Sequence, residues 1–374
     1  MKEIREILKA YSEAKTGGKK TALATVVKVE GSSYRQPGAR MLVTEDGSLT
    51  GAISGGCLEG DALRKALLAI HQKQNKLIIY NTNNEDDIEL GLQLGCNGIV
   101  HILFEYIDDG VSNNPMQLLK QLEIDRKEAV VVTLFSLKKQ APQIGTVLIY
   151  KVDTTLLQNH KIAQELLSDV KQVLENKMTI VKNIQEETQT EALIEYINPP
   201  ISLVIAGAGN DVQPLSEMAF LLGWEVNIGD GRATHATPKR FPEAKRVFVA
   251  KPEQLIQNTK IDAQTYFVLM THNYKYDLAL LKLLLESDCP YIGILGPKTK
   301  LNRMFGDLYN EGIIIKEQQL KCIYGPIGLD IGAETSEEIA LSIIAEIKAV
   351  ISGKEGSPLK YKLGKIHENA PYVK

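Results

Sequence analysis

Cysteine is scarce in this sequence, with four residues among 374 and none in a Cys-x-x-Cys pair. Without that spacing, the sequence offers neither a disulfide framework nor a zinc-finger ligand set. Four dispersed cysteines also do not match the spacing that holds a four-cysteine iron–sulfur cluster. Such usage is typical of a reducing compartment, and we expect a cytoplasmic protein.

A strong charge imbalance and a long apolar run are also missing. The formal net charge is −3 and no basic run is interleaved with aromatic residues, so we expect no nucleic-acid partner. No apolar stretch reaches the length that spans a membrane. Residues 1–15 are typical of an amphipathic helix rather than a signal peptide, and we expect no membrane association.

A glycine-rich turn with a cysteine is the most informative feature that is present. Residues 51–59 end a strand-like segment, cross Gly55 and Gly56, and place Cys57 where an apolar stripe at helical spacing begins. Glycines let backbone N–H groups turn toward a ligand, and a helix N-terminus favours an anion or a thiolate. Cys57 is therefore a candidate nucleophile or metal ligand. The alternative is a small buried hydrophobic residue at a tight turn.

The length and one proline pair predict two domains. A chain of 374 residues exceeds a single core, and Asn198-Pro199-Pro200 interrupts the pattern. We expect an N-terminal α/β domain over residues 1–197, with a polar helical segment at 155–197. A Rossmann-like domain with a parallel sheet should follow over 198–351, because short apolar strands alternate there with helices. Residues 352–374 should form a flexible tail.

The second domain carries a partial dinucleotide-binding fingerprint. Gly207 and Gly209 follow an apolar strand and precede a helix, and Asp230 closes the next strand, where a ribose-binding carboxylate belongs. The third glycine of the fingerprint is replaced by Val212. The pattern is consistent with NAD(P) binding or with a Rossmann fold that binds another ligand.

Further candidates follow the later strands of this domain. His272 could donate to a phosphate, accept a proton or bind a metal, or simply cap a helix. Lys298 and Arg303 could form an anion cradle or remain solvated. The loop containing Gly325, Gly328 and Asp330 could press its backbone against a flat ligand or serve only as a helix entrance, since Thr335 and Glu338 can form a capping box.

Two long segments, residues 31–61 and 325–347, resemble the xanthine dehydrogenase accessory factor family, also called XdhC/CoxI. The segment LGLQLGCNGIVHILFE matches the glycine–cysteine segment of the family. The family's motifs fall on Ser54, Gly55, Gly56, Cys57 and Glu59, on Gly95, Cys96 and Asn97, and on the loop from Gly325 to Glu334. The family's Rossmann turn usually carries a histidine where this chain has Asn210.

The resemblance implies an accessory protein that binds molybdenum cofactor (molybdopterin), protects it during sulfuration and assists its insertion into xanthine dehydrogenase. The implied partners are that type of molybdenum hydroxylase and a cysteine desulfurase. Some members carry the enzyme's own name. The hydroxylase itself is disfavoured, because it needs iron–sulfur domains that this sequence lacks.

Two hypotheses follow for the function. The first is a cofactor-binding maturation factor without turnover chemistry, in which Cys57 is the metal ligand and no residue is catalytic. The second is an NAD(P)-dependent oxidoreductase that uses Gly207, Gly209 and Asp230, with His272 as the acid or base. A homodimer is expected in either case, because symmetric dimers are the commonest assemblies.

Overall fold

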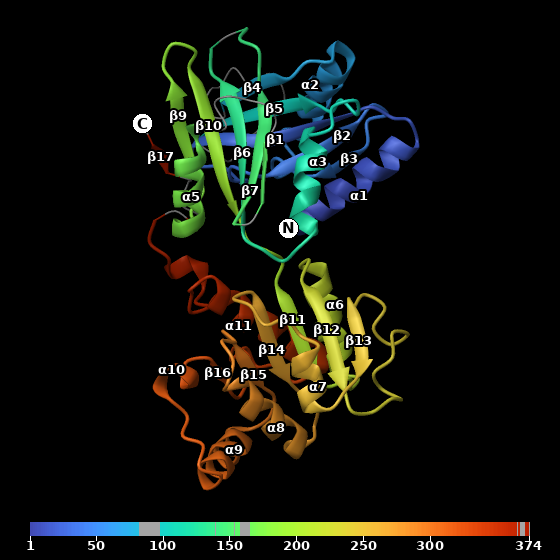
Figure 1. The fold of residues 1–374 in the computed structure, drawn as a ribbon, viewed down its shortest axis with the longest axis vertical. Helices are drawn as coiled ribbons and strands as arrows, with labels where there is room; N and C mark the ends of the chain where they lie inside the picture. Colours follow the sequence, from blue (N-terminus) through green and yellow to red (C-terminus); the bar gives the residue numbers. More distant parts are fainter. Residues whose placement is uncertain are drawn as a thin grey trace. The chain divides into compact units, whose positions relative to one another are not determined.

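The computed structural model describes residues 1–81, 98–138, 140–152, 154–157, 165–364, 366 and 371–373. The chain forms two compact units (Figure 1). Unit 1 comprises Met1–Pro199 with Lys365–Lys374, and unit 2 comprises Pro200–Gly364. Helices and sheets are combined in both units, so the expected α/β fold class is confirmed.

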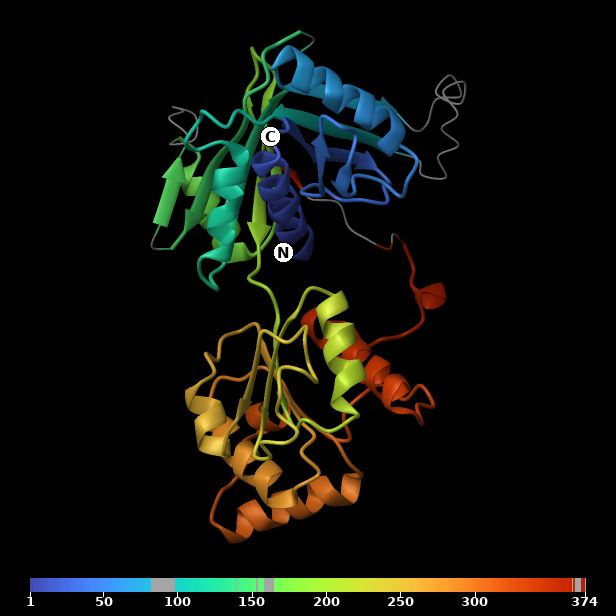
Figure 2. The same ribbon diagram turned by 90° about the vertical axis from the view of Figure 1, so that its right-hand side faces the viewer.

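Unit 1 begins with an antiparallel sheet, sheet A, in the strand order β3-β2-β1-β5-β4. Along β1, Ala22, Ala24 and Val26 pack with residues of α2, while Leu23 and Val27 belong to clusters on the opposite face. This alternation follows the two-residue period of a strand. Figure 2 shows α2 along one face of the sheet. The elements are α1 (Lys2–Thr16), β1 (Thr21–Gly31), β2 (Arg40–Thr44), β3 (Leu49–Gly51), α2 (Glu59–Gln72), β4 (Lys76–Asn81) and β5 (Gly98–Tyr106).

A second sheet, sheet B, packs on the other face of sheet A in the order β17-β9-β10-β6-β7-β8. Phe135 and Leu193 contact Val27 of sheet A, whereas Val130 and Val132 turn away and pack with α5. Unit 1 therefore has four layers: α2, sheet A, sheet B and α5. The elements are α3 (Pro115–Lys120), η2 (Gln121–Glu123), β6 (Ala129–Ser136), β7 (Gly145–Lys151), β8 (Thr154–Leu157), α5 (Leu167–Asn176), β9 (Ile180–Gln185), β10 (Thr190–Ile197) and β17 (Tyr372–Val373).

The expected helical segment at residues 155–197 is wrong for most of its described length. Only α5 is a helix there, and β9 and β10 form an antiparallel hairpin. Ala192 and Ile194 pack toward α5, while Leu193 packs between the sheets. The three consecutive apolar residues at the centre of β10 suit a strand that is buried on both faces, and this requirement outweighs the polar composition of the flanking residues.

Unit 2 contains one parallel sheet, sheet C, in the order β13-β12-β11-β14-β15-β16. Helices α6 and α11 pack on one face, and α7, α8 and α9 pack on the other. The expected Rossmann-like domain is therefore confirmed. The elements are β11 (Ser202–Ala206), α6 (Val212–Leu221), β12 (Glu225–Asp230), β13 (Arg246–Val249), α7 (Pro252–Gln257), β14 (Thr265–Leu269), α8 (Tyr274–Leu284), β15 (Ile292–Ile294), α9 (Lys298–Asn310), α10 (Glu317–Leu320), β16 (Ile323–Tyr324), α11 (Ser336–Ile351) and η3 (Leu359–Tyr361).

The C-terminal segment, expected to be a flexible tail, ends in an ordered contact with unit 1. Tyr372 pairs with Val181 of β9, and its hydroxyl donates a hydrogen bond to Glu191 at 2.9 Å. The ammonium group of Lys28 lies 4.4 Å from the centre of its ring. Tyr372 and Val373 thus extend sheet B by one short strand, β17.

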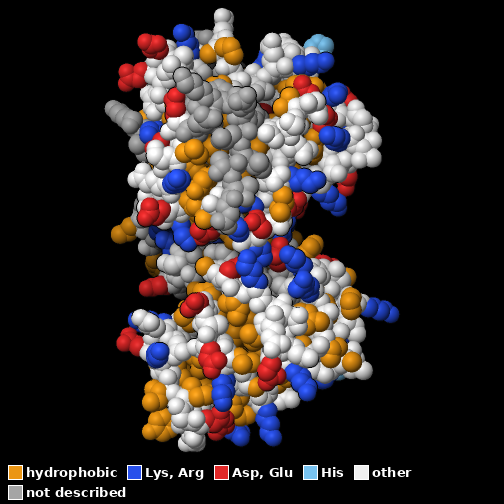
Figure 3. All heavy atoms as spheres, in the orientation of Figure 1, with side chains coloured by type: hydrophobic (Ala, Val, Ile, Leu, Met, Phe, Trp, Pro, Cys, Tyr) orange, Lys and Arg blue, Asp and Glu red, His pale blue; other side chains and the backbone are white. Residues whose placement is uncertain are grey.

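Charged side chains of both signs are interspersed over the face drawn in Figure 3. This distribution agrees with the small net charge of the chain. In the described part of the chain, no helix combines the length and the apolar character needed to cross a bilayer.

Candidate functional site

The turn between β3 and α2 is shaped by Ser54 and Glu59. The buried Ser54 Oγ accepts the N–H groups of Gly56 and Leu58, each at 3.1 Å, and donates to Glu59 Oε2. The other carboxylate oxygen of Glu59 accepts the Ser54 N–H at 2.9 Å. These two predicted site residues therefore hold the loop in shape and bind each other.

The two glycines of this turn have different roles. Gly56 has φ +110°, a conformation that side-chain-bearing residues rarely adopt. A Cβ atom at Gly55 would lie in ordinary van der Waals contact with the ring of Tyr34, at 3.5 Å, so this ring lies beside the backbone of the turn. Tyr34 is 69% exposed and is not among the residues predicted from the sequence, although it lies within the family-like segment 31–61. Its contact with Gly55 is not visible from sequence spacing.

Cys57 is exposed, so its alternative role as a buried hydrophobic residue is wrong. Its Sγ lies 3.8 Å from Ser54 Oγ, and α2 begins two residues later. In the described part of the chain, no hydrogen bond engages the backbone N–H groups of Gly55 or Cys57. The turn therefore presents a thiol and two backbone donors together. No group of three or more His, Cys, Asp or Glu residues in the described ranges could hold a metal ion.

Four of the turns predicted as sites in unit 2 share one edge of sheet C. Ala206 pairs with Gly229 and with Leu269, which in turn pairs with Ile294. Because parallel strands end at the same edge, the residues after them are neighbours there. The structure thus brings together the turns that contain Gly207, Asp230, His272 and Lys298, and β16 extends the same edge toward Gly325.

Gly207 and Asp230 lie in closely packed turns, and protein groups contact both of them. Gly207 has φ +126°, and a Cβ there would lie 2.4 Å from the Met270 carbonyl oxygen. Asp230 Oδ2 accepts the Ala208 N–H at 2.8 Å, and both its oxygens accept hydrogen bonds from the Arg232 side chain. Burial alone would raise the pKa of Asp230, but these hydrogen bonds hold it below its usual value. A ribose hydroxyl would have to compete with Arg232.

The N-terminus of α6 is occupied by protein groups where a pyrophosphate would bind in a dinucleotide site. Asp211, the N-cap residue, bonds through Oδ2 to His272 Nε2 at 2.7 Å. Arg240 donates to the Asn210 side chain at 2.7 Å and to the Ala208 carbonyl at 2.6 Å. A Cβ at Gly209 would lie 2.3 Å from Asp211 Oδ1. The carboxylate of Asp211 would repel a phosphate at this position.

The cationic residues of α9 are divided between the surface and the core. Lys298 is exposed, and the Arg303 guanidinium lies 4.4 Å from the centre of the Tyr274 ring. Lys300 instead points inward and bonds to the fully buried Asp277 at 2.7 Å. No described contact brings the side chains of Lys298 and Arg303 together into the predicted anion cradle.

The glycine-rich loop after β16 packs partly against α11. Gly328 has φ +105°, and a Cβ there would lie 2.3 Å from Ser342 Oγ. Asp330 and Glu334 are exposed. Thr335 and Glu338 form the expected capping box of α11. The first part of this loop thus serves packing, and the second part is accessible.

Of the other cysteines, the two that the structure describes are less accessible than Cys57. Cys96, with Gly95 and Asn97, lies outside the described residues. Cys289 is buried, and burial raises the pKa of its thiol to about 12. Cys322 is half-buried in unit 2.

Sequence comparisons agree with the two-unit architecture. Residues 14–81 match the family model described as the XdhC and CoxI family, and residues 203–347 match the XdhC Rossmann domain. A Bacillus subtilis protein named as a probable xanthine dehydrogenase subunit is 30% identical over 87% of this chain and 91% of its own length. The Escherichia coli molybdenum cofactor insertion chaperone PaoD is 22% identical over 92% of this chain and 88% of its own.

A solved structure is also similar to this chain. The crystal structure of a protein described as a xanthine dehydrogenase from Bacillus halodurans matches with a TM-score of 0.75 and 29% identity. It covers 96% of this chain and 99% of the solved chain. The likeness therefore extends over both units. This chain belongs to the XdhC and CoxI family.

Proposed function

We propose that this protein binds molybdenum cofactor and delivers it, after sulfuration, to a xanthine dehydrogenase-type molybdenum hydroxylase in the cytoplasm. The relative named as a molybdenum cofactor insertion chaperone supports this role, because the alignment spans 92% of this chain. The observation that carries the proposal is the β3–α2 turn, where the exposed Cys57 thiol lies beside backbone N–H groups that no described residue engages.

The chemistry of this turn fits the cofactor. Molybdenum cofactor combines a flat pterin, a dithiolene-bound metal and a phosphate, and its metal supplies the chemistry that the client enzyme performs. Thiolates are soft ligands that suit such a metal. The N–H groups of Gly55 and Cys57 could donate to an anionic oxygen. The exposed ring of Tyr34 offers a face on which a flat ring could stack.

Ser54 and Glu59 have a supporting role in this proposal. Their mutual hydrogen bonds fix the turn before any ligand arrives, which reduces the entropy lost on binding. The carboxylate of Glu59 is engaged by Ser54 at both oxygens, so it is held to the loop. We assign these two residues to positioning, and Cys57 to contact with the cofactor.

The test is cofactor loading of the purified full-length chain. Protein produced in cells that make molybdenum cofactor should carry it, measured as molybdenum by mass spectrometry and as oxidised pterin by fluorescence. Cys57→Ser should lower retention by about tenfold, the effect of losing one close contact worth about 1.4 kcal/mol. Cys322→Ser, which changes a half-buried cysteine of unit 2, is the matched control.

Activation of a client enzyme is the second readout. Loaded protein should activate a cofactor-free xanthine dehydrogenase-type hydroxylase, and a cysteine desulfurase should increase that activation. Wild-type protein that neither carries the cofactor nor activates the apoenzyme would overturn the proposal. Equal retention by wild type and Cys57→Ser would remove Cys57 from the site. Light scattering on the loaded sample tests the homodimer that we propose as the working assembly.

The NAD(P)-dependent oxidoreductase is the weaker alternative. Asp211 and its partner His272 occupy the N-terminus of α6, and Arg232 engages Asp230. No described contact in this corner favours a dinucleotide over these protein groups.

A further inference from the structure

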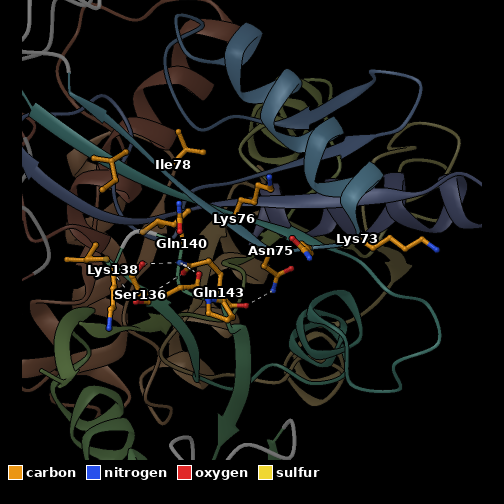
Figure 4. Close-up of a pocket in the computed structure, with 14 residues that line it drawn as sticks. Lys73, Asn75, Lys76, Ile78, Ser136, Lys138, Gln140 and Gln143 are labelled. Carbon is orange, nitrogen blue, oxygen red and sulfur yellow. Dashed lines mark hydrogen bonds between the residues drawn. The ribbon is translucent and has the colours of Figure 1, made fainter. Parts of the chain in front are cut away.

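Unit 1 contains a groove that the proposed cofactor site does not use. It has a volume of about 770 Å³ and lies between β4 with the residues before it and the loop joining β6 to β7. Figure 4 shows it with Lys73, Lys76 and Ile78 on one side and Lys138 and Gln140 on the other. We call it the β4 groove.

The β4 groove runs along the edge of a strand. The four consecutive residues 76–79 all line it, although neighbouring side chains of a strand point to opposite faces. A cavity that touches every residue in turn must therefore follow the strand's edge rather than one face. β4 is the terminal strand of sheet A, and within the described ranges no hydrogen bond outside the sheet engages the backbone of residues 76–80.

The walls of the groove are held in place by side-chain amides. Gln143 accepts the Ser136 N–H at 2.9 Å and donates to the Ser136 carbonyl at 3.0 Å, which fixes the β6–β7 loop. Asn75 donates to the Ile144 carbonyl and accepts the Tyr106 N–H, both at 3.0 Å. The bond from Asn75 to Ile144 joins the two sides of the groove, and the other bonds fix each side separately, so the width of the groove is set before any ligand binds.

The described charges of the groove are positive. Lys73, Lys76 and Lys138 line it, and no aspartate or glutamate is among the lining residues that the structure describes. In the described part of the chain, none of these three lysines forms a salt bridge, whereas Lys19, Lys28 and Lys151 of unit 1 each pair with a carboxylate. Between the charges lie Leu77 and Ile79, and the latter is 49% exposed. A partner must therefore bring carboxylates and some apolar surface.

We propose that the β4 groove binds an extended, acidic segment of a partner protein, which adds to sheet A beside β4. Addition of a strand satisfies the free backbone groups of an edge, and alternating side chains give specificity. A segment that alternates acidic and β-forming residues would direct carboxylates to the lysines. A nucleotide fits less well, because none of the described residues that line the groove is aromatic and could stack on a base.

The probe is a fluorescein-labelled ten-residue peptide of alternating threonine and glutamate, measured by anisotropy against the full-length chain at low salt. The triple variant Lys73→Glu, Lys76→Glu, Lys138→Glu should bind it at least about tenfold more weakly, since reversing three charges converts attraction into repulsion. The matched control, Lys9→Glu, Lys120→Glu, Lys171→Glu, reverses three exposed lysines of unit 1 that lie outside the groove. It should bind within about twofold of the wild type, because distant surface charges are screened by salt.

A second peptide separates strand addition from simple charge attraction. The same sequence with alternate backbone nitrogens methylated keeps its carboxylates but loses donors needed for pairing. It should bind at least about tenfold more weakly to the wild type. Equal binding of both peptides, or equal losses in the two triple variants, would overturn the proposal. Displacement of the peptide by micromolar inorganic pyrophosphate would also overturn it in favour of a small-anion site.

Discussion

His272 Nε2 lies 2.7 Å from Asp211 Oδ2, so the residue that caps α6 is bonded to the residue that follows β14 by three positions. This pair closes the corner of sheet C in which a dinucleotide would be held. It gives the exposed imidazole a carboxylate partner, which a phosphate would have to displace. The pairing explains why a strand–turn–helix fingerprint need not bind NAD(P).

The first prediction concerns nicotinamide cofactors. Addition of 1 mM NADH or NADPH should leave the melting temperature and the protein fluorescence unchanged, because Asp211 repels the pyrophosphate and Arg232 engages Asp230. Binding at about 10 µM affinity would instead stabilise the fold by about 2.7 kcal/mol at this concentration. A rise of several degrees with either nucleotide would contradict this interpretation.

Gly207 should not tolerate a side chain. In Gly207→Ala the new Cβ would lie 2.4 Å from the Met270 carbonyl oxygen, and φ +126° would add backbone strain. We expect a loss of about 2–4 kcal/mol in the free energy of unfolding, measured with urea. The control is Gly306→Ala in α9, where nothing lies within 4 Å of the added atom. That change should stabilise the protein by up to about 1 kcal/mol.

Ser54→Ala should weaken the β3–α2 turn. The variant loses the acceptor for the Gly56 and Leu58 N–H groups and the donor to Glu59. The free energy of unfolding should fall by about 1–2 kcal/mol, as for the loss of a helix cap. Ser12→Ala on the exposed face of α1 is the control and should change stability by less than about 0.5 kcal/mol. Similar losses in both variants would refute a special role for Ser54.

The buried carboxyl of Glu105 should make the stability of the protein depend on pH. Burial raises the pKa of this carboxyl to about 7, although Thr146 donates to it through N–H and Oγ1. Between pH 4.5 and 7 the folded state therefore holds a proton that the unfolded chain has lost, so stability contributed by this group falls as pH rises. Glu105→Gln should flatten this part of the stability profile, measured by urea unfolding from pH 5 to 8. A profile with the same slope in both proteins would show that Glu105 does not control it.

The parallel sheet of unit 2 and its ligand edge could be predicted from the sequence, because continuous apolar strands followed by glycine turns have few other arrangements. The hairpin of β9 and β10 could not be predicted, because the polar residues around Ala192 and Ile194 are typical of a helix on the protein surface. The exposure of Cys57 depends on the shape that Ser54 gives the turn, which no spacing rule contains.

Side-chain partners at the candidate sites were the least predictable part. Arg232 stands two residues after Asp230, and only the turn geometry brings its guanidinium back onto the carboxylate. Arg240 reaches Asn210 from thirty residues away, and Tyr34 reaches Gly55 across a loop. Such contacts depend on tertiary packing, and they decide whether a motif is available to a ligand.

Tyr372 pairs with Val181, so the end of the chain belongs to unit 1. The sequence of the Rossmann-like unit is therefore inserted into the sequence of unit 1. Its first residue follows Pro199, and its last precedes the segment that returns to sheet B. Both of its ends are thereby anchored, one by a peptide linkage and the other by β17. A single proteolytic cut near residue 200 should accordingly leave two fragments that stay associated until the C-terminal strand is released.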